Sequence, residues 1–149
     1  MRTISDVSGD AVKLMVIDGQ GGGIGATVIK GLREAIGDDL TILALGTNSI
    51  ATSRMMRAGA NKGATGQNAI VRTSGQVDAI IGPLAILMAN SMMGEMTPEM
   101  ASAVASSQAE KILIPLTQER VRIVGASAEP LPHLVGQVVD IIKEMFGNV

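Results

Sequence analysis

The feature that most constrains the fold is the stretch VIDGQGGGIGATVI, residues 16–29, in which glycines separate two apolar segments of different periodicity. The preceding KLMVID is typical of a buried strand, and the apolar residues that follow the glycines recur at helical spacing. Between them, five of the seven residues 19–25 are glycine. A strand, a glycine turn and a helix predict the first unit of an α/β fold in which a ligand approaches the backbone of the turn.

The same alternation continues along the chain. We expect further strands over 40–46, 77–82 and 111–116, because these runs are apolar without period-two alternation, as in parallel strands covered on both faces. We expect helices from 24 to 37, from Ser49, from the end of the third strand to about Met96, from Thr97 as N-cap, and up to Gly147. Residues 59–69 are glycine-rich and polar, which predicts a long loop.

Near the end of the chain, VRIVG (121–125) follows KILIPL (111–116) after only four residues. That gap cannot hold a crossover helix, so it predicts an antiparallel hairpin. The expected architecture is a three-layer Rossmann-like α/β fold: a mostly parallel sheet of about five strands with a C-terminal antiparallel hairpin strand. We expect one domain over 1–149, with 1–12 as a polar lead-in.

Composition excludes several classes of function. The chain has no cysteine, tryptophan or tyrosine and one phenylalanine, so thiolate chemistry, a tyrosine acid and base stacking on aromatic side chains are excluded. The net charge of −2 does not favour nucleic acid as a partner. No apolar run is long enough to span a membrane and the opening residues lack a secretory signal, so we expect a cytoplasmic protein.

The glycine turn is a candidate phosphate site, because N–H groups at the start of a helix are unsatisfied and the helix dipole favours an anion. We expect Gly23 to take a positive φ where the backbone meets the ligand. The residues predicted to form this part of the site are Asp18, Gly19, Gln20, Gly21, Gly22, Gly23, Ile24 and Gly25.

The glycine spacing can be interpreted in three ways. G-x-x-x-G-I-G resembles the nucleotide loop of short-chain dehydrogenases, and G-x-G-x-x-A is close to the general dinucleotide fingerprint. GGGIGAT also resembles the phosphate loop of ParA-like ATPases, but Ala26 stands where that loop has its lysine. The dinucleotide interpretation requires an acid about 20 residues later, where the chain has LGTNS (45–49). This favours NADP or another adenine nucleotide over NAD.

A basic zone lies on the same side of the predicted site. No Asp or Glu occurs from Leu40 to Val77, although the chain has 14, and this zone carries four cations. They would place positive charge over the strand ends where phosphates lie. The remaining predicted ligand contacts are Thr47, Asn48, Ser49, Arg54, Asn61, Lys62, Thr65, Gly82 and Pro83.

Candidates for catalysis are few. Asp18 could act as an acid, a base or a Mg²⁺ ligand, or could cap the glycine turn, and Lys62 is a second candidate. His133 is the only histidine and begins the last helix, a position typical of the surface. No cluster has the spacing of a metal site, and we predict no metal. Without tyrosine, the reaction of short-chain dehydrogenases is excluded.

The segments VIDGQGGGIG, LGTNSIATSRMMRAGANKGATGQNAIV, DAIIGPLAILMANSMMGEMTPEMA and KILIPL together resemble the family called domain of unknown function 3842. The resemblance covers residues 13–124 and implies a small Rossmann-like bacterial protein. It carries no assigned activity and no catalytic residues.

Three functions follow from these patterns. The first is a nucleotide- or dinucleotide-binding protein, a sensor or cofactor-handling accessory, whose partner is a small phosphorylated ligand. The second is a small enzyme acting on a phosphorylated metabolite, with Asp18 or Lys62 in the chemistry. The third is a structural subunit that forms a homo-oligomer through the methionine-rich region 84–100.

Overall fold

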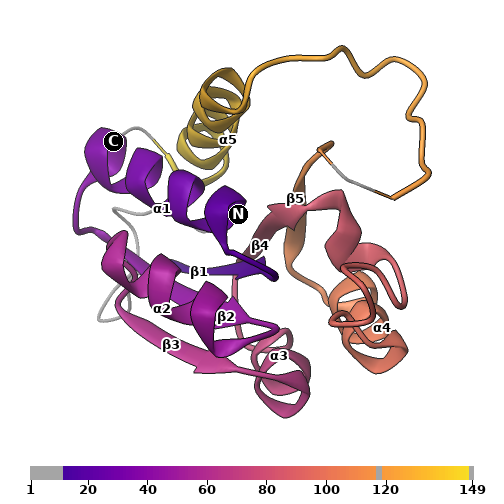
Figure 1. Ribbon diagram of the computed structural model, residues 1–149. Helices are drawn as coiled ribbons and strands as arrows, with labels where there is room; N and C mark the ends of the chain where they lie inside the picture. Colours follow the sequence, from indigo (N-terminus) through magenta and orange to yellow (C-terminus); the bar gives the residue numbers. More distant parts are fainter. Residues whose placement is uncertain (1–11, 117–118, 148–149) are drawn as a thin grey trace.

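The structure, a computed structural model, describes residues 12–116 and 119–147. Five strands form one parallel sheet in the order β3-β2-β1-β4-β5 (Figure 1). The strands are β1 (Val12–Asp18), β2 (Leu40–Gly46), β3 (Lys62–Thr65), β4 (Ala79–Pro83) and β5 (Glu110–Ile114).

Helices cover both faces of this sheet. Their bounds are α1 (Gly23–Ile36), α2 (Ser49–Arg57), α3 (Gln67–Thr73), the 3-10 helix η1 (Leu84–Leu87), α4 (Pro98–Ser106) and α5 (Leu131–Phe146). Leu14 and Val16 of β1 pack with α1, α2 and α5 in one core cluster. Met15 and Ile17 pack with α3, η1 and α4 in the other. The central strand is apolar on both faces because each of its faces meets a helical layer.

The predicted antiparallel hairpin is wrong. β5 pairs with β4 in parallel, and residues 121–125 form no strand. Pro115 follows β5 directly and has no N–H for a continued ladder. The chain instead runs from residue 119 to 130 without helix or strand, on the way to α5 (Figure 1).

The loop predicted over 59–69 contains a strand, β3, that pairs in parallel with β2. Its four residues are exposed, so no hydrophobic pattern marks it. Gly63 fits there because a Cβ would lie 2.9 Å from atoms of both Met56 and Thr52 of α2. Close packing of α2 therefore requires the glycines that made this segment look like a loop.

The helix expected up to Met96 is also wrong, since only η1 is helical in that region. Asn90, Met92 and Met93 have left-handed φ values of 66°, 55° and 56°, which no helix allows. The Asn90 N–H donates to the Met96 carbonyl at 2.7 Å and closes the segment into a compact turn. The buried methionines of this segment are spaced as in a helix, but they are buried because the segment folds into a turn.

Candidate functional site

A pocket lies where the strand order changes direction. The chain passes from β1 to β2 and β3 on one side, and then returns to place β4 and β5 on the other side of β1. In such sheets ligands bind at the carboxyl ends of the strands, at this switch point. The pocket has a volume of about 540 Å³, within the roughly 300–1,000 Å³ of ligand sites, and is lined by residues that include Asp18, Gln20, Ile24, Pro83, Met92 and Glu119.

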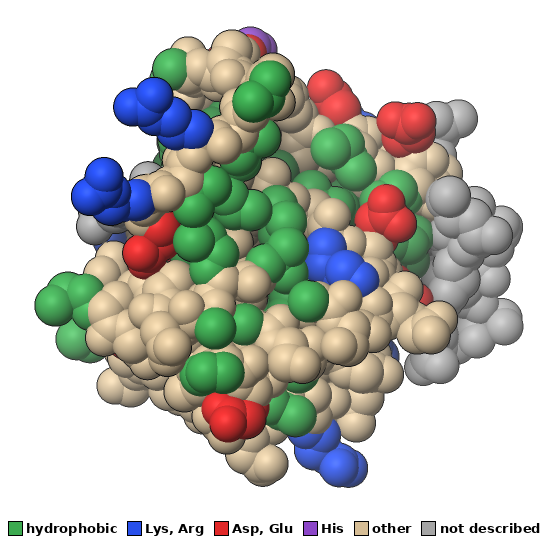
Figure 2. All heavy atoms as spheres, turned by 90° about the vertical axis from the view of Figure 1, so that its right-hand side faces the viewer, with side chains coloured by type: hydrophobic (Ala, Val, Ile, Leu, Met, Phe, Trp, Pro, Cys, Tyr) green, Lys and Arg blue, Asp and Glu red, His purple; other side chains and the backbone are tan. Residues whose placement is uncertain are grey.

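The strands point toward the right-hand side of Figure 1, and Figure 2 turns that side to the viewer. Hydrophobic side chains gather in the middle of this face, and the Lys, Arg, Asp and Glu side chains stand separately beside and around them. The carboxyl side of the sheet therefore offers an apolar surface with isolated charges next to it.

The glycine turn between β1 and α1 depends on Gly22. Gly22 has a φ of 73°, and a Cβ there would lie 2.8 Å from Cα of Ala51 in α2. Its N–H donates to the Gly19 carbonyl at 2.9 Å, and its carbonyl accepts from Ala26. The positive φ expected at Gly23 is thus found at Gly22, because Gly23 is already the first residue of α1.

The side chain of Asp18 caps this turn by accepting its N–H groups. Its Oδ1 accepts the Gly19 N–H at 2.8 Å and its Oδ2 accepts the Gly25 N–H at 2.7 Å. Burial raises the pKa of the Asp18 carboxyl above its ordinary value, against the opposing effects of the Gly25, Gly19 and Ile24 N–H groups and of Arg54. Both carboxylate oxygens therefore have donors within the turn, and Asp18 acts as the internal anion at the start of α1.

The raised pKa of Asp18 predicts a pH dependence of folding. The folded state holds the proton more tightly than the unfolded state, whose pKa is near the ordinary 3.8. The stability that the protonated Asp18 carboxyl adds is fully present below the unfolded-state pKa. It is lost as the pH rises through the folded-state pKa. Urea unfolding at pH values from the unfolded-state pKa to above the folded-state pKa of Asp18 should show wild type losing stability relative to Asp18→Asn as the pH increases. A constant difference between the two proteins would contradict the shift.

Two N–H groups of the turn stay available. Among the described residues, the N–H groups of Gly21 and Gly23 have no hydrogen-bond acceptor. Arg54 of α2 reaches over them: its Nη1 donates to the Gly21 carbonyl at 3.3 Å and lies 3.4 Å from where a Cβ on Gly23 would be. Free N–H groups, the α1 dipole and an exposed guanidinium form a site suited to a phosphate.

On the β2 side of the turn, an acid that the sequence analysis missed completes the site. Glu95 Oε1 accepts the Gln20 N–H at 2.8 Å, the Thr47 hydroxyl at 2.6 Å and the Asn48 amide at 2.9 Å. Desolvation by burial acts to raise the pKa of Glu95, but the hydrogen bonds from Gln20, Thr47 and Asn48 together outweigh it and lower that pKa. No local motif marks this residue, because 75 positions separate it from Gln20.

The structure brings only some of the other predicted residues to the site. Pro83 lines the pocket, and Gly82 lies directly before it at the end of β4. Ser49 begins α2 as an exposed residue beside the Asn48 cap. Thr65 ends β3 and its hydroxyl lies 2.7 Å from that of Thr52.

Asn61 and Lys62 lie away from the pocket. Asn61 Oδ1 accepts the Ile42 N–H at 2.7 Å near the amino end of β2. Lys62 is exposed and pairs in register with Leu43, three residues before the end of β2. The structure therefore separates the two candidates for catalysis, Asp18 and Lys62, by the β2 strand between them.

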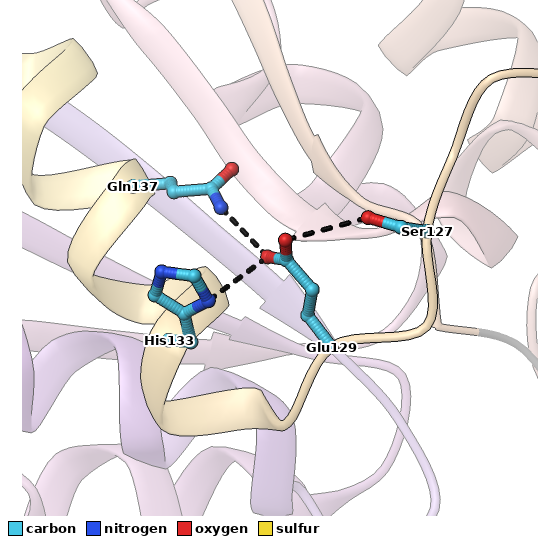
Figure 3. Close-up of polar contacts among 4 residues, drawn as sticks. All are labelled: Ser127, Glu129, His133 and Gln137. Atoms are coloured by element: carbon cyan, nitrogen blue, oxygen red, sulfur yellow. Dashed lines mark hydrogen bonds and ion pairs between the residues drawn. The ribbon is translucent and has the colours of Figure 1, made fainter.

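His133 lies outside the pocket, at the start of α5. Figure 3 shows it beside Glu129, whose carboxylate also accepts from Ser127 and Gln137. His133 Nδ1 is 3.1 Å from Glu129, and the histidine side chain is 64% exposed. Through Glu129, this cluster connects the 119–130 segment to His133 and Gln137 of α5. No three His, Cys, Asp or Glu side chains of the described residues are grouped to hold a metal ion.

The methionines of the 84–100 region divide into two groups. Met92, Met96 and Met100 are buried in the core between the sheet and α4, whereas Met93 is 95% exposed. Core packing accounts for the first group. Within the described residues, no helix is long and apolar enough to cross a membrane.

Comparisons with known proteins bear on the fold and the family. A family model described as Domain of unknown function (DUF3842) matches residues 13–147. No curated protein sequence matches the chain. Among solved structures, the chain is similar to the dodecameric FMN-dependent Ubix-like decarboxylase from Escherichia coli O157:H7. The TM-score is 0.50 at 15% identity, over 91% of this chain and 94% of that one. At that identity the similarity shows the fold alone.

Proposed function

The chain belongs to the DUF3842 family, whose description names no activity, and we propose from its site that it binds a phosphorylated nucleotide with a planar ring, of the flavin mononucleotide class. The ring would occupy the pocket between the ends of β1 and β4, and the phosphate would lie on the glycine turn. The observation that carries this proposal is the position of the pocket at the switch point, where it is lined by Gln20 and Ile24. These two residues flank the part of the turn that holds the free N–H groups and that Arg54 reaches.

The walls of the pocket suit a flat apolar ring. Ile24, Pro83 and Leu116 line it together with Met92. Methionine sulfur makes favourable contacts with aromatic rings, so Met92 would substitute for the aromatic side chains that the chain lacks. Asn90 lies on the same wall and offers an amide to the polar edge of the ring.

The phosphate would take the donors that the fold leaves open. The N–H groups of Gly21 and Gly23 and the guanidinium of Arg54 lie at the start of α1, where the helix dipole favours negative charge. Asp18 and Glu95 take the N–H groups on either side, so they define the limits of this anion position.

A mononucleotide is favoured over the NADP or adenine dinucleotide expected from the sequence. The adenosine half of a dinucleotide would lie over the end of β2, on Thr47 and Asn48. Those side chains are bonded to Glu95. The solved structure with a similar fold is described as FMN-dependent, which agrees with a mononucleotide but does not transfer to this chain by itself.

Arg54 and Arg57 provide a matched pair of variants. Both are exposed on α2, but Arg54 reaches the glycine turn whereas Arg57 bonds Ser53 of its own helix. Arg54→Ala should weaken FMN binding in equilibrium dialysis by about tenfold or more, because a charge-assisted contact to phosphate is lost. Arg57→Ala should bind like wild type. Riboflavin, which lacks the phosphate, should bind both variants equally; equal losses of FMN in both would contradict the proposed phosphate position.

A second candidate is assembly with further copies of this chain. Met93 is 95% exposed, and Ile123 and Val124 of the 119–130 segment are 42% and 101% exposed. Exposed apolar side chains of this kind are available to a protein partner, and the protein of similar fold is described as dodecameric. If copies pack through this segment, the double change Ile123→Asp and Val124→Asp should reduce the sedimentation mass to that of one chain. A wild type that already sediments as a single chain would exclude this assembly.

The enzyme hypothesis has no specific support from the geometry. Asp18 is occupied by N–H donors and Lys62 is remote from it. We therefore propose binding of the nucleotide and assign no reaction.

A further inference from the structure

Glu95 lies where a larger ligand would extend from the glycine turn, and its role in the choice between ligands rests on the proposed function of the same site. The carboxyl ends of β1 and β2 lie beside each other in register, with Asp18 opposite Gly46. In a dinucleotide site the pyrophosphate lies on the turn after β1, and the adenosine extends over the end of β2. This second half of the site is where Glu95 lies.

The polar groups of Gln20, Thr47 and Asn48, which an adenylate would meet there, are already bonded to Glu95. The carboxylate oxygen accepts from the hydroxyl of Thr47, the amide of Asn48 and the N–H of Gln20. The same oxygen lies 2.9 Å from where a Cβ on Gly19 would be, so it is packed against the backbone of the turn. A ligand must break these three hydrogen bonds before it can occupy this position.

Anchors within the 88–97 segment hold Glu95 in place. Its own N–H donates to the Met92 carbonyl at 3.1 Å, and the next residue, Met96, is completely buried. The Ser91 hydroxyl donates to the Ala85 carbonyl at 2.6 Å, and the Met92 N–H donates to Glu119 at 2.8 Å. The carboxylate is therefore fixed by backbone bonds and core packing on both sides of it.

The charge of Glu95 disfavours an adenylate over β2, as its position does. A carboxylate beside the glycine turn repels a second phosphate and, most strongly, a 2′-phosphate on the adenosine ribose. On the other side of the turn, toward β4, the pocket is open. Arg54 of α2 reaches the turn at the Gly21 carbonyl, beside the remaining N–H groups. Charge and space thus favour one phosphate at the turn and a ring on the β4 side.

We infer that Glu95 selects mononucleotides by occupying the adenylate position over β2, so that the site accepts FMN and rejects FAD. FMN and FAD share the flavin and differ only in the adenylate half, which makes them a matched pair of ligands.

The experiment is equilibrium dialysis of FMN and FAD against wild type, Glu95→Ala, Glu95→Gln and the control Glu99→Ala. Glu99 is an exposed glutamate in the first turn of α4. Wild type and the control should bind FMN about tenfold or more tightly than FAD. Glu95→Ala should reduce that ratio by about tenfold, because FAD binding should tighten more than FMN binding once the adenylate position is open. Glu95→Gln, which keeps an acceptor without the charge, should lie between them.

Three outcomes would overturn the inference, and they differ from one another. If wild type binds FMN but the FMN-to-FAD ratio is the same in Glu95→Ala, Glu95 does not select the ligand. If Glu95→Ala and Glu95→Gln lose FMN and FAD alike while remaining folded, Glu95 holds the ligand and does not exclude the adenylate. If wild type binds neither flavin, the proposed function is wrong and the selection falls with it.

Discussion

Replacement of Gly22 by alanine should lower the free energy of unfolding by about 2–5 kcal/mol. The residue holds a φ of 73°, which costs an L-residue about 1–2 kcal/mol. The added Cβ would also lie 2.8 Å from Cα of Ala51 and 3.0 Å from its carbonyl oxygen. Both are backbone atoms of α2, so the clash cannot be relieved by a change of rotamer.

Gly23→Ala is the matched control for this prediction. Gly23 is the first residue of α1, and the nearest atom to an added Cβ is Arg54 Nη1 at 3.4 Å. Alanine also has a higher helix propensity than glycine. Urea unfolding should therefore show a large loss for Gly22→Ala and little change for Gly23→Ala. The described turn would be contradicted by equal stabilities of the two variants.

Removal of the Asp18 carboxylate should be the second large effect. Asp18→Ala leaves the N–H groups of Gly19 and Gly25 without acceptors in a buried turn, which costs about 2–4 kcal/mol. The α1 dipole also loses the negative charge at its start. Thermal or urea unfolding measures this loss directly.

Asp18→Asn separates the lost acceptors from the lost charge. The amide oxygen can still accept one N–H. The asparagine is also uncharged, so the variant does not bury a charge, which is the cost that raises the pKa of Asp18. Asp18→Asn should thus be more stable than Asp18→Ala at neutral pH. If Asp18→Ala unfolds like wild type, Asp18 is not the cap of the glycine turn.

The strands and helices with the strongest patterns could be predicted from the sequence. The apolar run that became β1, the glycine turn and α1 lie where periodicity and glycine place them. Thr97 is the N-cap of α4 as expected, and its hydroxyl accepts the Met100 N–H at 3.3 Å. These features depend on neighbouring residues, which is why a sequence pattern is enough to find them.

The features that the sequence did not predict correctly have a common cause, because each of them is decided by contacts between residues distant in the sequence. β3 has no hydrophobic pattern and is a strand only because β2 lies beside it. Residues 121–125 have the alternation of a strand but no neighbouring strand in the described chain. Glu95 reaches the glycine turn only because the 88–97 segment folds into a turn.

The location of the pocket required the strand order. The sequence predicted ligand contacts at Thr47 and Asn48, since dinucleotide motifs place an adenosine there, and also at Gly82 and Pro83, but it did not show which strand lies beside β1. Whether β4 joins the sheet next to β1 or at an edge does not follow from local patterns. The observed order puts β4 beside β1 and opens the pocket between them.

The most direct test of the nucleotide site is a methionine methyl NMR titration with FMN. Phe146 is the only aromatic residue and is buried in α5, so a bound flavin adds a ring-current shift that no protein ring near the pocket supplies. We predict that the methyl resonances of Met92 and Met93 shift as FMN is added, while that of Met145 in α5 stays in place. Unchanged resonances at Met92 and Met93 at saturating FMN, or larger shifts elsewhere, would contradict a flavin in the pocket between β1 and β4.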